Sequence, residues 1–177
     1  TTVLLIATLF LLVLSFFLAG SEVAFFSLTS KDINILKTRK QPSYRRIVML
    51  LEQPKTLLAT MLIANSFINI GIILISNLLL HDWLKDYGLS PLLDFIIKVL
   101  SVTFLLVLFA EVLPKVWATH HKIWFASNAS LIIDVFNSIF SRLSKRFVQF
   151  SDSIEQKVAY SKNAGLDNSN LDYAIDL

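Results

Sequence analysis

Residues 3–26 read VLLIATLFLLVLSFFLAGSEVAFF, and Glu22 is the one charged side chain in this run. A helix needs ~20 apolar residues to cross the hydrocarbon core of a bilayer, so the run predicts a membrane-spanning helix. Two more runs meet the same requirement. They cover residues 55–80, where Lys55 is the one charge, and residues 91–113, where the charged residues stand near the two ends. We therefore predict three spans.

The composition agrees with a membrane protein. The chain is 55% hydrophobic and 16% charged, whereas soluble domains are about 45–50% apolar and about 25% charged. The net charge is +3, and the basic residues stand between the apolar runs, next to lipid headgroups. No basic stripe with interleaved aromatic residues indicates nucleic-acid binding. The absence of cysteine excludes disulfides, thiolate metal sites and cysteine nucleophiles.

Loop charges predict how the spans are oriented. The loop at residues 27–53 carries six basic residues, whereas the loop at residues 81–90 carries one, Lys85. The positive-inside rule then places the N-terminus outside, the first loop in the cytoplasm, the second loop outside and the C-terminus in the cytoplasm. The six basic residues are Lys31, Lys37, Arg39, Lys40, Arg45 and Arg46. The apolar N-terminus lacks a basic region, so we do not expect a removed signal peptide.

A fourth apolar stretch, residues 123–150, fits either a further span or a helix at the cytoplasmic interface. Its large apolar residues recur every three or four positions and form one stripe on a helix: Ile132, Phe136, Ile139, Leu143, Phe147 and Phe150. A span would carry Arg142, Lys145 and Arg146 outside, against the charge rule. We therefore favour a helix that lies in or against the cytoplasmic interface and packs on the spans.

The predicted fold is an all-α membrane domain over residues 1–150. From residue 151 the chain turns polar, and residues 166–172 could begin a short capped helix. We expect residues 151–177 to be a cytoplasmic linker that leads to a further module.

Polar residues within the spans are the candidate functional residues, because such groups are costly in hydrocarbon. With the predicted orientation they fall at similar depths in the inner half of the membrane, where they could meet. Their carboxylate, amide and hydroxyl oxygens suit hard cations such as Mg²⁺, Ca²⁺ or Na⁺. They are Gly20, Ser21 and Glu22 of the first span, Asn65, Ser66 and Asn69 of the second, and Glu111 of the third.

Structural interpretations of these residues stay open. Asn65 and Asn69 are one helical turn apart and could join helices by hydrogen bonds without binding an ion. Glu22 lies near the cytoplasmic end and could reach water. Gly20 could free backbone carbonyls through local irregularity, and Pro114 removes one helical hydrogen bond near Glu111.

Other polar residues receive structural interpretations. Asp94 and Lys98, four residues apart, should pair near the outer surface. Asp134 should mark the wet face of the interfacial helix. His120 and His121 are adjacent and point to different faces of a helix, which disfavours a metal site there.

Three short motifs occur in order, one on each predicted span. Residues 15–29 read SFFLAGSEVAFFSLT, residues 62–69 read LIANSFIN, and residues 110–115 read AEVLPK. Together they resemble the signatures of the CorC / cyclin M family. These signatures are an FSGSE-type element, a second-span asparagine motif and a third-span GEhhPK element in which h is apolar. The resemblance covers nearly the whole chain.

The resemblance implies a three-span domain with short juxtamembrane helices that works as a homodimer in the bacterial inner membrane. It implies that the domain binds Mg²⁺ and moves it out of the cytoplasm, with Na⁺ as the proposed driving ion. It also implies a cytoplasmic part with paired CBS modules that bind ATP and Mg²⁺. A bacterial subgroup is associated with gliding motility, and the chain could belong there.

Matched motif to motif, the resemblance implies Ser21, Asn65 and Glu111 as ion-site residues, with Gly20 and Asn69 in the same signatures. Two other functions use the same helices. A membrane scaffold or regulatory subunit, such as one of a motility complex, would not transport. An intramembrane enzyme could use the two span glutamates as an acid–base pair, but no nucleophile, histidine or catalytic metal motif accompanies them.

Overall fold

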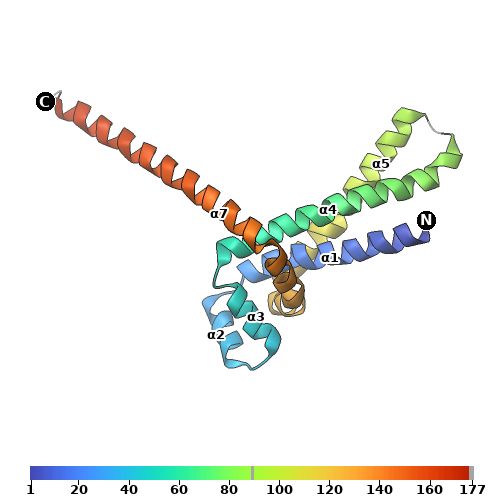
Figure 1. The fold of residues 1–177 in the computed structure, drawn as a ribbon, viewed down its shortest axis with the longest axis horizontal. Coiled ribbons are helices and arrows are strands. Elements are labelled where there is room, and N and C mark those ends of the chain that lie inside the picture. Colours follow the sequence, from blue (N-terminus) through green and yellow to red (C-terminus); the bar gives the residue numbers. More distant parts are fainter. Residues whose placement is uncertain (89, 176–177) are drawn as a thin grey trace.

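The computed structural model describes the backbone of residues 1–88 and 90–175, and the side chains up to residue 155 except at positions 86 and 89. All regular structure in these residues is helical. Three long rods form a bundle (Figure 1): α1 (Thr2–Phe26), α4 (Pro54–Leu84), and a third rod made of α5 (Pro91–Leu105), the π-helical segment η2 (Leu106–Val112) and α6 (Leu113–His120). The rods correspond to the three apolar runs, and the third continues past residue 113 to His120.

Prolines and caps define where these rods begin. Both α4 and α5 start with a proline, Pro54 and Pro91, at a position where the missing N–H costs no helical hydrogen bond. The Ser90 hydroxyl caps α5 by accepting the Leu93 N–H at 3.5 Å. Between the rods, the 3₁₀ turn η1 (Lys85–Tyr87) ends at Gly88, whose φ of 59° favours glycine.

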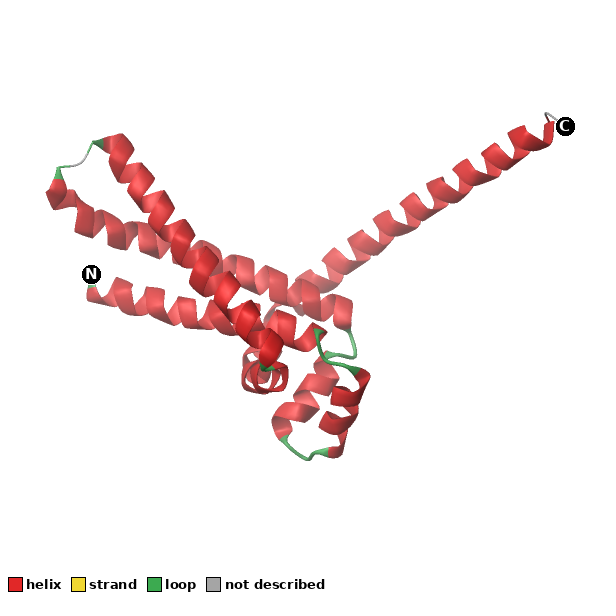
Figure 2. Cartoon of the chain, turned by 180° about the vertical axis from the view of Figure 1, so that it is seen from behind, coloured by secondary structure: helices red, strands yellow, loops and turns green. Residues whose placement is uncertain are grey.

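Two short helices, α2 (Ser30–Thr38) and α3 (Pro42–Leu50), connect α1 to α4 at one end of the bundle (Figure 2). A capping box starts α2. In this box the Thr29 hydroxyl accepts the Asp32 N–H at 3.3 Å and the Asp32 carboxylate accepts the Thr29 N–H at 2.9 Å. The basic loop predicted at residues 27–53 is therefore largely helical.

The last helix, α7 (Lys122–Ile175), is not parallel to the rods. Figures 1 and 2 view its first turns nearly end-on while α1 and α4 lie across the page, so it begins at a steep angle to them. The helix continues without a break past residue 150, where the predicted linker begins, and its C-terminal end extends away from the bundle (Figure 1). Residues 166–172 are helical in backbone, and their side chains lie outside the described residues.

The C-terminal part of the predicted apolar stripe of α7 faces away from the rest of the chain, whereas Ile132 and Phe136 pack against the core. Ile139, Phe147 and Phe150 are 58–67% exposed. The polar side of the helix packs on α4 instead, where the Thr60 hydroxyl lies 2.8 Å from Ser144 Oγ and 3.3 Å from Asn137 Oδ1. This arrangement leaves the apolar stripe available to lipid.

The number of spans stays a prediction. Four helices among the described residues are long and apolar enough to cross a membrane: the three rods and the segment Lys122–Glu155 of α7. Length and composition alone do not separate three spans with an interfacial α7 from four spans. The homodimer is likewise a prediction.

Candidate cation site

An oxygen cluster joins α1 to α4. The Ser15 Oγ lies 3.1 Å from Asn65 Oδ1 and 3.0 Å from Asn69 Oδ1. Ser15 is fully buried and the two asparagines are half-buried. A hydroxyl has one proton to donate, so it cannot satisfy both amide oxygens at once. Three oxygen atoms from two helices thus converge at one point, and oxygen atoms arranged in this way suit a hard cation.

A charged group lies where α6 meets α1. Lys115 Nζ is 3.6 Å from the Glu111 carboxylate and 3.8 Å from the Glu22 carboxylate. One ammonium group thus faces two carboxylates. The two carboxylates and the ammonium group together carry a formal charge of −1. The Glu22 side chain is 22% exposed and that of Glu111 is 53% exposed within the single chain. The expectation that Glu22 reaches water stays a prediction.

Glu111 belongs to the irregular part of the third rod. The π-helical segment η2 contains it and ends two residues before Pro114. Proline has no N–H, so the carbonyl of Ala110 lacks the donor that an α-helix would supply at position 114. Single π-helical turns are frequent at functional sites. The irregular backbone expected near Glu111 is therefore present.

Gly20 and Ser21 lie in regular helix. The structure has no irregularity at Gly20, because α1 is one α-helix from Thr2 to Phe26. Gly20 instead admits α7: a Cβ built there would lie 2.3 Å from Phe125 Cε1. The Ser21 hydroxyl is fully buried and donates to the Leu18 carbonyl at 2.8 Å. Its lone pairs stay available to a ligand.

Four of the predicted residues, Asn65, Asn69, Glu22 and Glu111, thus gather in two groups along one face of α1, whereas Gly20, Ser21 and Ser66 belong to neither group. Ser15 and Glu22 are seven residues apart, which puts them on the same face about 10 Å apart along the axis. The amide cluster lies at one level, and the carboxylate group lies at the next level toward the α1–α2 connection. In the described part of the chain no hydrogen bond or ion pair links the two levels.

The family of the chain follows from a comparison of its sequence with family models. The model of the cyclin M transmembrane N-terminal domain matches residues 6–170. The chain belongs to the cyclin M family. This family is associated with metal-ion transport across membranes and is not a family of enzymes.

A curated relative supports the same family. The chain is 30% identical over 118 residues to a UPF0053 protein of Haemophilus influenzae. The match covers 67% of this chain and 27% of the length of that protein. The matched segment thus spans roughly a quarter of the length of that relative.

Two residues of the amide cluster and the carboxylate group were not predicted from the sequence. Ser15 looked like part of an apolar run, although its position seven residues before Glu22 is the signal that places it on the same helix face. Lys115 was noted only as part of the AEVLPK motif. Its role in joining two helices depends on how α6 packs on α1, which no local pattern reveals.

The ligand types set limits on the ion. Among the described residues, no three His, Cys, Asp or Glu side chains gather at a potential metal site. The candidate ligands are instead hydroxyl and amide oxygens with carboxylates nearby, which suit a hard cation that keeps part of its water shell, as Mg²⁺ does.

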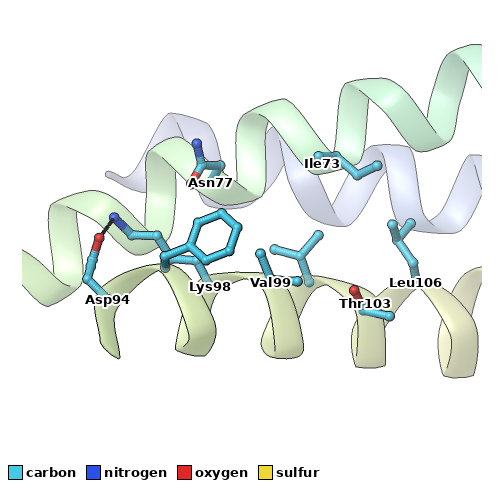
Figure 3. A pocket seen from close by; sticks show the side chains of 9 residues that line it. Ile73, Asn77, Asp94, Lys98, Val99, Thr103 and Leu106 are labelled. Carbon is cyan, nitrogen blue, oxygen red and sulfur yellow. Dashed lines mark hydrogen bonds and ion pairs between the residues drawn. The ribbon is translucent and has the colours of Figure 1, made fainter. Parts of the chain in front are cut away.

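The end of the third rod next to the α4–α5 connection carries an ion pair that does not belong to this site. Lys98 Nζ lies 2.6 Å from Asp94 Oδ2 and 3.3 Å from His81 Nδ1, which confirms the predicted Asp94–Lys98 pair. The pair lines a cavity of about 410 Å³ between α4 and α5 (Figure 3). Most of its other lining residues are apolar. The ammonium group of Lys98 disfavours a cation there.

Proposed function

We propose that this cyclin M domain binds Mg²⁺ in the inner half of a bacterial inner membrane and moves it out of the cytoplasm, with Na⁺ as the coupling ion. The observation that carries the proposal is the cluster of Ser15, Asn65 and Asn69, in which a buried hydroxyl oxygen and two amide oxygens converge. Oxygen atoms that converge inside an apolar bundle can coordinate a cation.

The proposed ligands are the amide cluster and Ser21, which lies one residue before Glu22 and outside the two groups. Asn65 and Asn69 contribute amide oxygens, and Ser15 and Ser21 contribute hydroxyl oxygens. Mg²⁺ holds water tightly and is bound by few protein groups, so water completes its shell. Gly20 shapes the site by letting α7 approach and contributes no side chain.

Glu111 and Glu22 provide the charge that attracts the ion. Lys115 neutralises part of this charge in the structure. An arriving dication competes with the ammonium group for the Glu111 carboxylate, because both favour the same oxygens. Lys115 then moves aside as the ion enters, and returns when the ion leaves.

The proposed assembly includes parts outside the chain. The outward faces of α5 are apolar, with Phe95, Leu100 and Phe104 at 64–67% exposed, which fits lipid or a second copy of the domain. We propose a homodimer whose C-terminal ends lead to cytoplasmic CBS-type modules, and these modules would bind ATP. The oriented charge pattern supports a cytoplasmic C-terminus.

Ion flux tests the proposal. The full-length protein is reconstituted in liposomes, and Mg²⁺ movement is followed with a fluorescent indicator, with and without a Na⁺ gradient. The Asn65→Ala/Asn69→Ala double variant should lose most of the flux. The matched control is Ser66→Ala, since the Ser66 hydroxyl is exposed and donates to Leu62 O of its own helix at 2.8 Å.

Two results would contradict the proposal. Wild-type liposomes that move no more Mg²⁺ than empty ones would favour the scaffold function. Normal flux through the double variant would show that the amide cluster is structural.

A further inference from the structure

One buried hydroxyl on α4 has no hydrogen-bond partner. Ser76 is 5% exposed, and its Oγ makes no hydrogen bond. Among the buried side-chain polar atoms in the described residues, only Arg46 Nε shares this property. A buried polar atom without a partner costs free energy, so the hydroxyl needs an explanation.

Hydroxyl groups on apolar helices usually satisfy themselves within the helix. Thr8 donates to Leu4 O at 2.9 Å, and Ser66 donates to Leu62 O at 2.8 Å. Ser76 does not form such a bond. Its position inside a membrane bundle also keeps it from bulk water, so a bound water or ion is the partner that remains.

The helical register places Ser76 on the same face as the oxygen cluster. It follows Asn69 by seven residues, just as Thr8 precedes Ser15 by seven, and this spacing returns to the same side of a helix. The two helices run antiparallel (Figure 1). Between the two levels, a Cβ at Gly71 would lie 3.3 Å from Leu11 Cδ1, so the helices stay in close contact there.

Thr8 supplies a second oxygen on this level. The residue is 5% exposed, and its hydroxyl donates to its own helix, which leaves the lone pairs of Oγ1 free to accept or coordinate. Both hydroxyls lie about 10 Å from the Ser15 cluster, toward the end of the bundle that holds the N-terminus and the α4–α5 connection (Figure 1).

We propose that Thr8 and Ser76 form the next binding step for a partly hydrated cation, between the Ser15–Asn65–Asn69 cluster and the outer surface. The inference rests on the proposed function and extends it along the seam of α1 and α4. Two hydroxyls replace some of the water around the ion without holding it tightly, as a transit position requires.

Cysteine accessibility tests this step without a transport assay. The chain has no cysteine, so a Ser76→Cys variant of the full-length protein carries a single thiol in this domain. In liposomes it is exposed to a membrane-impermeant cationic thiosulfonate from the outside. The control is Leu74→Cys on the same helix, because Leu74 is 61% exposed on the outer surface of the bundle and faces lipid.

Labelling at position 76 should be at least about tenfold faster than at position 74, since an apolar environment raises a thiol pKa by one unit or more and removes the reactive thiolate. Mg²⁺ at about ten times its dissociation constant should slow labelling at position 76 roughly tenfold, because only the unoccupied fraction reacts. The same comparison applies on α1 with Thr8→Cys against Leu9→Cys, which covers the case in which Ser76→Cys does not fold.

Equal labelling at positions 76 and 74, and at positions 8 and 9, would overturn the inference. Fast labelling that Mg²⁺ does not slow would show a water-filled crevice and would also overturn it. Either result is distinct from failure of the proposed function, which the flux of the wild-type protein decides separately.

Discussion

Gly20 is a packing residue that allows α7 to lie against α1. A Gly20→Ala substitution would place a methyl group 2.3 Å from the Phe125 ring, and such overpacking costs about 1–3 kcal/mol. We expect a lower melting temperature in detergent for Gly20→Ala. Gly71→Ala is the control, because its Cβ would meet only the flexible end of Leu11 at 3.3 Å, and alanine favours a helix by about 1 kcal/mol over glycine.

Loss of the ring in a Gly20→Ala/Phe125→Leu double variant should recover part of the stability. Unchanged melting of Gly20→Ala alone would mean that α7 adjusts without cost, and that the close approach at Gly20 does not fix its position.

Glu111 should matter for transport more than Glu22. Both carboxylates face Lys115, but Glu111 lies in the π-helical segment next to Pro114, where the backbone can change without breaking a regular helix. Glu111→Gln keeps the size of the side chain and removes the charge that offsets a dication. We expect Mg²⁺ export to fall strongly in Glu111→Gln and less in Glu22→Gln, with unchanged gel-filtration profiles.

The opposite ranking would mean that the wrong carboxylate has been assigned. Normal export by both variants would mean that the carboxylates are structural, and that the ion depends on hydroxyl, amide and backbone oxygens.

At the scale of elements, one ion pair ties α2 to the start of α7. Lys122 Nζ lies 2.6 Å from Asp32 Oδ2. This hydrogen bond, together with the Thr29 hydroxyl and N–H, holds the pKa of Asp32 well below its ordinary value of 3.8. A depressed carboxylate pKa stabilises the fold above the ordinary pKa, and the stabilisation is lost as the pH falls below it.

An Asp32→Asn variant should therefore melt at a lower temperature than wild type at pH 7, and the difference should shrink as the pH falls below about 4. Thermal melts in detergent across this range measure it. Lys122→Gln removes the other partner of the ion pair. It should lower the melting temperature of the wild type but change that of Asp32→Asn much less. A difference that does not depend on pH would show that the charge of Asp32 is not what stabilises this connection.

The helices themselves were predictable from local patterns. The lengths of the apolar runs predicted five of the six ends of the rods to within a few residues, and Pro91 marked the start of the third rod. The continuation of the third rod to His120 was not predicted, because the prediction followed the apolar run, which ends at residue 113. The chain accommodates the proline with a widened π-helical turn before it.

The arrangement of the site was harder to predict because it depends on contacts between distant segments. The asparagines stood out as polar residues in an apolar run, but nothing local shows that both amide oxygens turn toward Ser15. The stripe on α7 was recognised, but periodicity does not say which side is covered. Asn137 and Ser144 of α7 are bonded to Thr60 of α4, a contact that no local pattern indicates.

At the scale of the whole molecule, a bound ion should stabilise the domain. Oxygen ligands from α1 and α4 would be cross-linked by one Mg²⁺, which binds the folded state alone. At 100 times its dissociation constant such a ligand adds about 2.7 kcal/mol to the free energy of unfolding. Thermal melts in detergent with increasing Mg²⁺ should show a rise that is absent in Asn65→Ala. No rise in melting temperature at millimolar Mg²⁺, or an equal rise in the variant, would rule out the proposed ion site.

The orientation of the molecule decides whether the proposed site faces the cytoplasm. Six basic residues in the α1–α4 connection predict that α2, α3 and the C-terminus are cytoplasmic. The exposed apolar stripe of α7 and the steep angle at which it begins fit a helix that lies along the inner surface (Figures 1 and 2). Single cysteines introduced at three positions can test this orientation, because the chain has no cysteine of its own.

We expect Lys40→Cys in the α2–α3 turn and Ser153→Cys on α7 to be protected from an impermeant reagent applied outside, and Tyr87→Cys in the α4–α5 connection to react. The Tyr87 side chain is 76% exposed, so it reports access directly. Reaction at position 153 with protection at position 40 would show that α7 crosses the membrane and that the domain has four spans. Reaction at both positions 40 and 153 with protection at position 87 would invert the whole domain. The Ser15 cluster would then lie in the outer half of the membrane, and the direction proposed for transport would no longer follow from the charge pattern.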